Sequence, residues 1–144
     1  MAELREKIDA EFENLEQVVQ ELPQADALHK LSSLELNGVA VLVHNFYNGV
    51  ENILKQIARS QSLKLTDGPS WHRDLLGSSR AAGVVSDHTA ERLKEYLGFR
   101  HLFSHGYAFN LEKERLVPLA AELPQTLQQF KKDIEKAVQR LAGE

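Results

Sequence analysis

Three residues in the second half of the chain, Arg100, His105 and Tyr107, form an Arg-x4-His-x-Tyr pattern that suits work on a phosphate ester. A histidine titrates near neutral pH, so His105 can take a proton from a ribose 2′-hydroxyl or give one to a leaving 5′-oxygen. The guanidinium of Arg100 can bind the phosphate and stabilise the charge that develops on it. These residue types suit RNA cleavage without a metal ion, which makes Arg100 and His105 candidate catalytic residues.

The spacing of these residues also constrains the backbone that carries them. On a continuous helix, residues five apart point about 140° away from each other, so Arg100 and His105 would not face one reacting group. Gly106 can adopt the left-handed conformation that ends many helices, which predicts a helix end near Ser104 or His105. His105 would then lie at a helix C-terminus, where the helix dipole favours a protonated imidazole and the side chain can turn toward Arg100.

Simpler roles compete with catalysis for the same residues. Arg100 can pair with Glu95 or Glu112 on a solvated surface, and His105 can serve only as a helix cap. His101 and His105 have the i, i+4 spacing of helical metal ligands, but no third ligand stands nearby in the sequence and a helix end spoils the geometry. We therefore expect neither a metal site nor a cofactor.

Other residues are candidates for contact with RNA rather than for chemistry. His101 and Ser104 lie inside the same stretch, and Arg73 lies in a second polar segment with His72. His72 and Arg73 can line an RNA groove, although a solvated face is the interpretation we favour for this pair. Trp71 is expected to anchor the core or a dimer interface rather than to stack on a base.

Hydrophobic periodicity indicates that helices carry these residues. Apolar side chains recur at steps of three and four from Leu4 to Leu22, which marks one face of an α-helix, and Pro23 ends it. Asp26 is expected to cap a second helix whose apolar stripe continues to Ile57.

The second predicted helix has features of its own. Gly38 and Gly49 each cost about 1 kcal/mol relative to alanine inside a helix, which favours a kink or the close approach of another helix. Tyr47 is expected to pack against its neighbours. Three polar residues form a stripe that we expect to make a hydrogen-bonded helix contact rather than a second site: His44, Asn48 and Glu51.

The rest of the chain predicts three more helices. Ser70 follows a turn-rich segment and is expected to cap a short helix that ends near Gly77, while Ser86 or Asp87 caps a fourth helix. The apolar steps of the last segment run straight through Pro124, which predicts one long helix kinked at that proline. No segment alternates with a period of two, so the expected fold is an all-α antiparallel bundle of about five helices.

Length and composition are those of one ordinary globular domain over residues 1–144. There is no cysteine, no signal-peptide pattern at the start and no stretch near the roughly 18 apolar residues of a membrane helix, so we expect a soluble cytoplasmic protein that does not enter a membrane. The net charge of −4 is concentrated in residues 1–70. Residues 71–115 carry a slight positive balance and four of the six histidines, so any contact with RNA is expected there.

Three further stretches accompany the Arg-x4-His-x-Tyr pattern in a fixed order: residues 46–54 (FYNGVENIL), 71–76 (WHRDLL) and 96–99 (YLGF). Together they resemble the HepT-like ribonuclease toxins of the HEPN superfamily over nearly the whole chain. The resemblance implies a HEPN-like homodimer that acts as the endoribonuclease toxin of a HEPN/MNT toxin–antitoxin pair. One motif supplies a single histidine, and a two-fold dimer that brings two motifs together would supply two.

The same resemblance assigns a role to Tyr107. It implies that Tyr107 is the target of AMP transfer by a partner MNT-type nucleotidyltransferase, the antitoxin, in a complex that can be larger than a dimer. This chain lacks the Gly-Ser and paired-Asp pattern of a nucleotidyltransferase, so that enzyme must be another protein. The alternative is a non-catalytic subunit that presents a substrate to a nucleotidyltransferase.

Overall fold

The computed structural model describes residues 2–63, 65–105 and 113–143, and every regular element in these ranges is a helix. This confirms the all-α expectation. The elements follow one another as α1 (Ala2–Glu21), the 3-10 helix η1 (Ala25–Lys30), α2 (Ser33–Ser60), α3 (Trp71–Ala81), α4 (Asp87–His105) and α5 (Lys113–Gly143).

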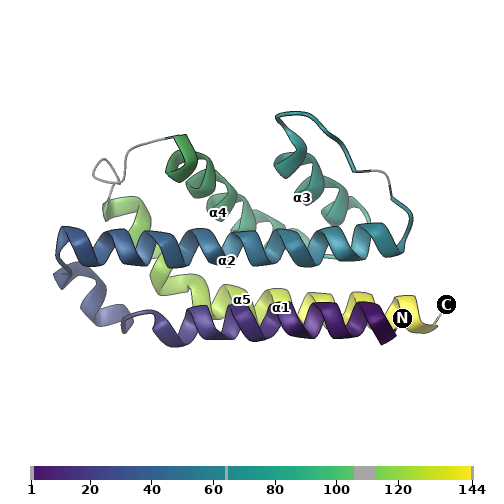
Figure 1. Cartoon of the computed structure of the whole chain (residues 1–144), viewed down its shortest axis with the longest axis horizontal. Helices are drawn as coiled ribbons and strands as arrows, with labels where there is room; N and C mark the ends of the chain where they lie inside the picture. Colours follow the sequence, from purple (N-terminus) through teal and green to yellow (C-terminus); the bar gives the residue numbers. More distant parts are fainter. Residues whose placement is uncertain (1, 64, 106–112, 144) are drawn as a thin grey trace.

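The long helix α2 forms the middle of the bundle. It runs along the longest axis with α1 and α5 on one side and the shorter α3 and α4 on the other (Figure 1). Helix α2 contacts all four of the other α-helices, and α3 and α4 also contact each other. A side chain in the middle of α2 can therefore reach α3 and α4 at the same time.

The start of α2 differs from the sequence prediction. Residues 25–30 form a separate 3-10 helix, and α2 begins only at Ser33 rather than after Asp26. The reason is a capping box at Ser32 and Glu35, in which the Ser32 N–H donates to Glu35 Oε1 at 2.9 Å and the Glu35 N–H donates to Ser32 Oγ at 3.1 Å. Hydrogen bonds from Ser32 also lower the pKa of Glu35.

Helix α3 extends beyond its predicted end. It continues through the exposed Gly77 to Ala81 because Leu75, Leu76 and Ser79 are buried, and that packing outweighs the cost of one helical glycine. The chain then turns at Gly83, which has a positive φ of 75° that glycine adopts without strain.

The start of α4 and the continuity of α5 follow the sequence. Ser86 caps α4, since its Oγ accepts a hydrogen bond from the Thr89 N–H at 3.1 Å. The structure describes α4 as far as His105, and the helix-ending Gly106 expected from the sequence lies outside the described residues. Helix α5 continues through both Pro118 and Pro124. None of the helices in the described ranges is long and apolar enough to cross a membrane.

The two glycines of α2 have different surroundings. A Cβ at Gly49 would lie 2.5 Å from Leu15 Cδ2, so the missing side chain lets α1 approach α2 closely, one of the two roles expected for it. A Cβ at Gly38 would meet nothing within 4 Å. Helices α1 and α5 thus pack against one side of α2, and α3 and α4 pack against the opposite side.

Candidate functional site

Arg100 lies in the C-terminal half of α4 and faces α2. Its Nε is 3.8 Å from Oε1 of Glu51, a carboxylate whose side chain is only 4% exposed. The sequence left open a surface pair of Arg100 with Glu95 or Glu112. The structure pairs Arg100 with Glu51 rather than with Glu95, and Glu112 lies outside the described residues. Arg100 of α4 therefore lies against a buried carboxylate of α2.

The second partner of Glu51 comes from α3. His72 Nδ1 lies 2.9 Å from Glu51 Oε1 and 2.8 Å from Oε2, and the histidine side chain is 18% exposed. A carboxylate only accepts hydrogen bonds, so Nδ1 must carry a proton and donate it. Glu51 thus links α2 to His72 of α3 and Arg100 of α4, and His72 does not lie on the solvated face that we favoured from the sequence.

Two polar atoms beside this carboxylate have no hydrogen-bond partner among the described residues: Tyr47 Oη and Arg100 Nε. The ion pair between Arg100 and Glu51 is too long for a hydrogen bond, which leaves Nε unsatisfied. Burial, with a further contribution from the Glu51 carboxylate, raises the pKa of Tyr47, so the phenol stays neutral. Tyr47 packs in the core as predicted, yet its hydroxyl faces a polar cluster that is only partly satisfied.

His44 of α2 is a neighbour of Arg100 of α4. Its ring lies 4.8 Å from the Phe103 ring between centroids, and its Nδ1 is 3.4 Å from Asn48 Nδ2. Burial, with a smaller contribution from the Arg100 guanidinium, lowers the pKa of His44. The histidine is therefore a neutral neighbour of the arginine, and the predicted polar stripe of α2 makes the helix contacts expected of it.

An open depression of about 470 Å³ lies between the start of α3 and the C-terminal half of α4. Its wall carries two arginines and two histidines: His72, Arg73, Arg100 and His101. The structure thereby brings the predicted Arg100 together with two candidate RNA contacts, His101 and Arg73, the latter exposed as expected. Cationic and imidazole groups around one hollow suit an anionic ligand such as a phosphate ester.

Three of the predicted site residues fall at the limit of what the structure describes. The backbone of α4 reaches His105, but the side chains of Ser104 and His105 lie outside the described residues, as does the whole of Tyr107. Within the described ranges, no three histidine or acidic side chains are grouped so that they could hold a metal ion.

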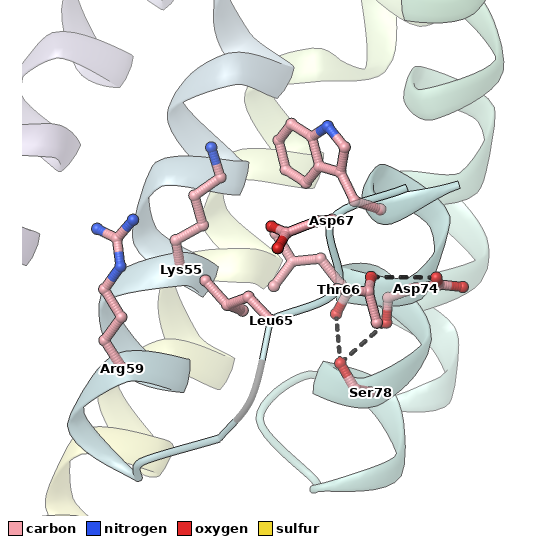
Figure 2. Close-up of a pocket in the computed structure, with 9 residues that line it drawn as sticks. Lys55, Arg59, Leu65, Thr66, Asp67, Asp74 and Ser78 are labelled. Carbon is pink, nitrogen blue, oxygen red and sulfur yellow. Dashed lines mark hydrogen bonds between the residues drawn. The ribbon is translucent and has the colours of Figure 1, made fainter. Parts of the chain in front are cut away.

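A second depression, of about 340 Å³, is lined by residues of α2, α3 and the segment between them, including Trp71. Figure 2 shows Lys55 and Arg59 of α2 on one side of it, and Thr66 joined to Asp74 on the other by a hydrogen bond of 3.1 Å. Lys55 Nζ lies 4.2 Å from the centre of the Trp71 ring, and the His72 ring lies 3.5 Å from it. These neighbours, together with its packing against the core, support the anchoring role predicted for Trp71 over base stacking.

The sequence predicted a helix contact for Glu51 and did not foresee that its partners are His72 and Arg100. Glu51 lies among the buried apolar residues of α2, such as Val50 and Leu54, and an acid on that face needs a buried cationic or hydrogen-bonding partner. That position was the available signal, but it does not say which helix supplies the partner.

Comparison with protein families shows where the chain belongs. The model of a family described as HepT-like protein matches residues 38–141, which cover most of α2 and α5, all of α3 and α4, and the contacting residues Glu51, His72 and Arg100. No curated protein and no solved structure matches the chain.

Proposed function

The chain belongs to the HepT-like family, and from that membership and the depression beside Arg100 we propose that it is the ribonuclease toxin of a toxin–antitoxin pair. The reaction is metal-independent cleavage of RNA, with Arg100 and His105 as catalytic residues. The observation that carries the proposal is the set of cationic and imidazole side chains on one hollow, with Arg100 beside a buried carboxylate.

The chemistry follows from the residue types. Arg100 binds the scissile phosphate, the ribose 2′-oxygen attacks phosphorus, and the bond from phosphorus to the 5′-oxygen breaks. The 2′-hydroxyl loses its proton to a base, and the leaving 5′-oxygen gains one from an acid. The products are a 2′,3′-cyclic phosphate and a 5′-hydroxyl, and the cleavage step consumes no water. His105 is one of the two proton-transfer groups, and His101, Ser104 and Arg73 are candidate contacts to the flanking RNA.

Cleavage by the purified protein in excess EDTA, with analysis of the product ends, tests this function. Wild type is expected to leave 2′,3′-cyclic phosphates, and His105→Ala should cleave about 10²–10⁴-fold more slowly. His88→Ala is the matched control, because His88 is exposed at the opposite end of the same helix. A wild-type protein that binds RNA but never cleaves it would favour the alternative, a non-catalytic subunit that presents a substrate to a nucleotidyltransferase.

We further propose that two chains form a homodimer that brings their motifs to one groove, since HepT-like family membership supports such an assembly. The mass of the active species in solution tests it. A protein that remains monomeric at micromolar concentration and still cleaves RNA would contradict the dimer.

Regulation of the toxin is proposed to act through Tyr107. A partner MNT-type nucleotidyltransferase transfers AMP to the hydroxyl, and each AMP adds about one negative charge, which competes with RNA phosphate for nearby cations. Co-expression with the partner should add multiples of one AMP mass to wild type and none to Tyr107→Phe, which stays active. If the phenylalanine variant still gains the mass, the modified residue lies elsewhere.

A further inference from the structure

We propose that His72 is a second catalytic residue of this reaction, supplied by the same chain as Arg100 and acting as the base that takes the 2′-hydroxyl proton. The inference rests on the proposed ribonuclease function and adds a residue to it. Three observations support it. His72 contacts Glu51, Arg100 lies beside the same carboxylate, and both His72 and Arg100 line one depression.

Glu51 orients the imidazole. Both carboxylate oxygens lie within 2.9 Å of His72 Nδ1, so the proton is held on that nitrogen. In the neutral ring the lone pair is then on Nε2, at the opposite side of the ring from Glu51. A buried carboxylate that fixes the tautomer and the angle of a histidine is the arrangement that prepares such a ring to act as a base.

Glu51 also sets the position of His72 relative to the phosphate site. Arg100 Nε lies 3.8 Å from the same Oε1 that His72 approaches at 2.9 Å. Both side chains line the hollow between α3 and α4, so a phosphate held by Arg100 would place its ribose near His72. Because three helices meet at one carboxylate, this geometry exists within one chain and needs no second copy.

The proposed step balances as follows. His72 Nε2 takes the proton of the 2′-hydroxyl, the 2′-oxygen forms a bond to phosphorus, and the phosphorus–5′-oxygen bond breaks. The departing 5′-oxygen takes its electron pair with it and receives a proton from His105. Exchange with solvent then returns His72 to its neutral form and His105 to its protonated form.

A purely structural role for His72 is the competing explanation, because a buried Glu51 needs a hydrogen-bond donor whatever the function. The variant His72→Asn separates the two. The asparagine amide can still donate to Glu51 from nearly the place of Nδ1, but it has no group where Nε2 lies. A structural role predicts normal cleavage by a folded His72→Asn protein, and a catalytic role predicts a loss of about 10²–10⁴-fold in kcat with little change in KM.

The sharpest test uses two RNA substrates, one normal and one whose scissile 5′-oxygen is replaced by sulfur. Sulfur leaves without a proton, so loss of the acid matters little on this substrate and loss of the base still matters. We expect His105→Ala to recover most of its activity on the sulfur substrate and His72→Asn to remain impaired on both. His88→Asn, from an exposed position on α4, should behave as wild type on both.

Each outcome decides a separate question. If His72→Asn is folded and as active as wild type while His105→Ala is inactive, the ribonuclease assignment stands and the role of His72 is wrong. If sulfur restores His72→Asn, His72 is not the base. If wild type cleaves neither substrate, the proposed function fails, and the role of His72 fails with it.

Discussion

Glu51 and Asp133 are both buried carboxylates, with 3% and 9% of the residue exposed, but the structure satisfies them differently. Asp133 of α5 accepts a hydrogen bond at 2.9 Å from the backbone N–H of Ser86, the capping residue of α4. Glu51 instead contacts two side chains, His72 and Arg100, that can both act on a ligand.

The surroundings of the two acids differ in the same way. Ser86 is well satisfied, since its Oγ also contacts Thr89 Oγ1 at 3.0 Å and accepts from the Thr89 N–H. Near Glu51, by contrast, Tyr47 Oη and Arg100 Nε lack partners among the described residues. The carboxylate of Asp133 has a backbone hydrogen-bond donor and joins two helices. The groups around Glu51 keep unused hydrogen-bonding capacity at the wall of a hollow, which suits them to bind a ligand.

The largest difference expected between the two regions contrasts two arginines of α4. Arg100→Ala should slow RNA cleavage by about 10²–10³-fold, because the phosphate loses the group that stabilises its developing charge. Arg92→Ala is the matched control, since Arg92 pairs with Glu122 of α5 at 3.0 Å and does not line the hollow. Single-turnover rates measure both, and equal losses in the two variants would remove the distinction between the regions.

Replacement of Asp133 should affect stability rather than activity. Asp133→Ala leaves the Ser86 N–H without its acceptor and should lower the free energy of unfolding by about 1–3 kcal/mol. Glu135→Ala, which removes a more exposed pair with Arg5, should cost no more than about 1 kcal/mol. Urea titrations give both values, and a folded Asp133→Ala protein that has lost cleavage activity would contradict the structural role.

Two buried tyrosines test, with a smaller expected effect, whether a hydroxyl has a hydrogen-bond partner. Tyr96 Oη donates to the Leu119 carbonyl oxygen at 2.7 Å, so Tyr96→Phe should lower the free energy of unfolding by about 1 kcal/mol. Tyr47→Phe removes a hydroxyl that lacks a described partner and should leave stability unchanged or slightly increased. A clear loss of stability in Tyr47→Phe would show that the cluster is satisfied after all.

The smallest effect concerns pH. The folded protein lowers the pKa of His44 from an ordinary value of 6.5, so the unfolded chain binds the proton more readily. The stability contributed by neutral His44 is present above that ordinary value and is lost as pH falls from it toward the lowered pKa. Unfolding curves across this window should be less pH-dependent for His44→Gln than for wild type. An identical slope in both proteins would assign the dependence to other groups.

Local patterns predicted most of the fold because helices are local structures. Steps of three and four identified the buried faces, and Ser86 caps the start of α4 as the sequence indicated. The start of α2 was wrong because the capping box at Ser32 competes better than Asp26 for the first turn. The end of α3 was wrong because tertiary packing carries the helix past Gly77.

The site was predictable only in part, for a different reason. Arg100 and His105 lie close in sequence, so their spacing is visible without a structure. The contacts of Glu51 with His72 and Arg100 join residues from three helices, and no short pattern records which of the buried faces will meet. The sequence alone therefore favoured a solvated position for His72, because it does not show that α2 and α3 meet there.

The position of bound RNA tests the central claim most directly. Titration of ¹⁵N-labelled His105→Ala with a short single-stranded RNA, followed by NMR, reports which backbone amides move while cleavage is blocked. Binding at the hollow between α3 and α4 predicts shifts at residues 72–73 and 98–101 and none at Ser86, Thr89 or Asp133. Shifts confined to the Asp133 region, or none anywhere at saturating RNA, would contradict the account.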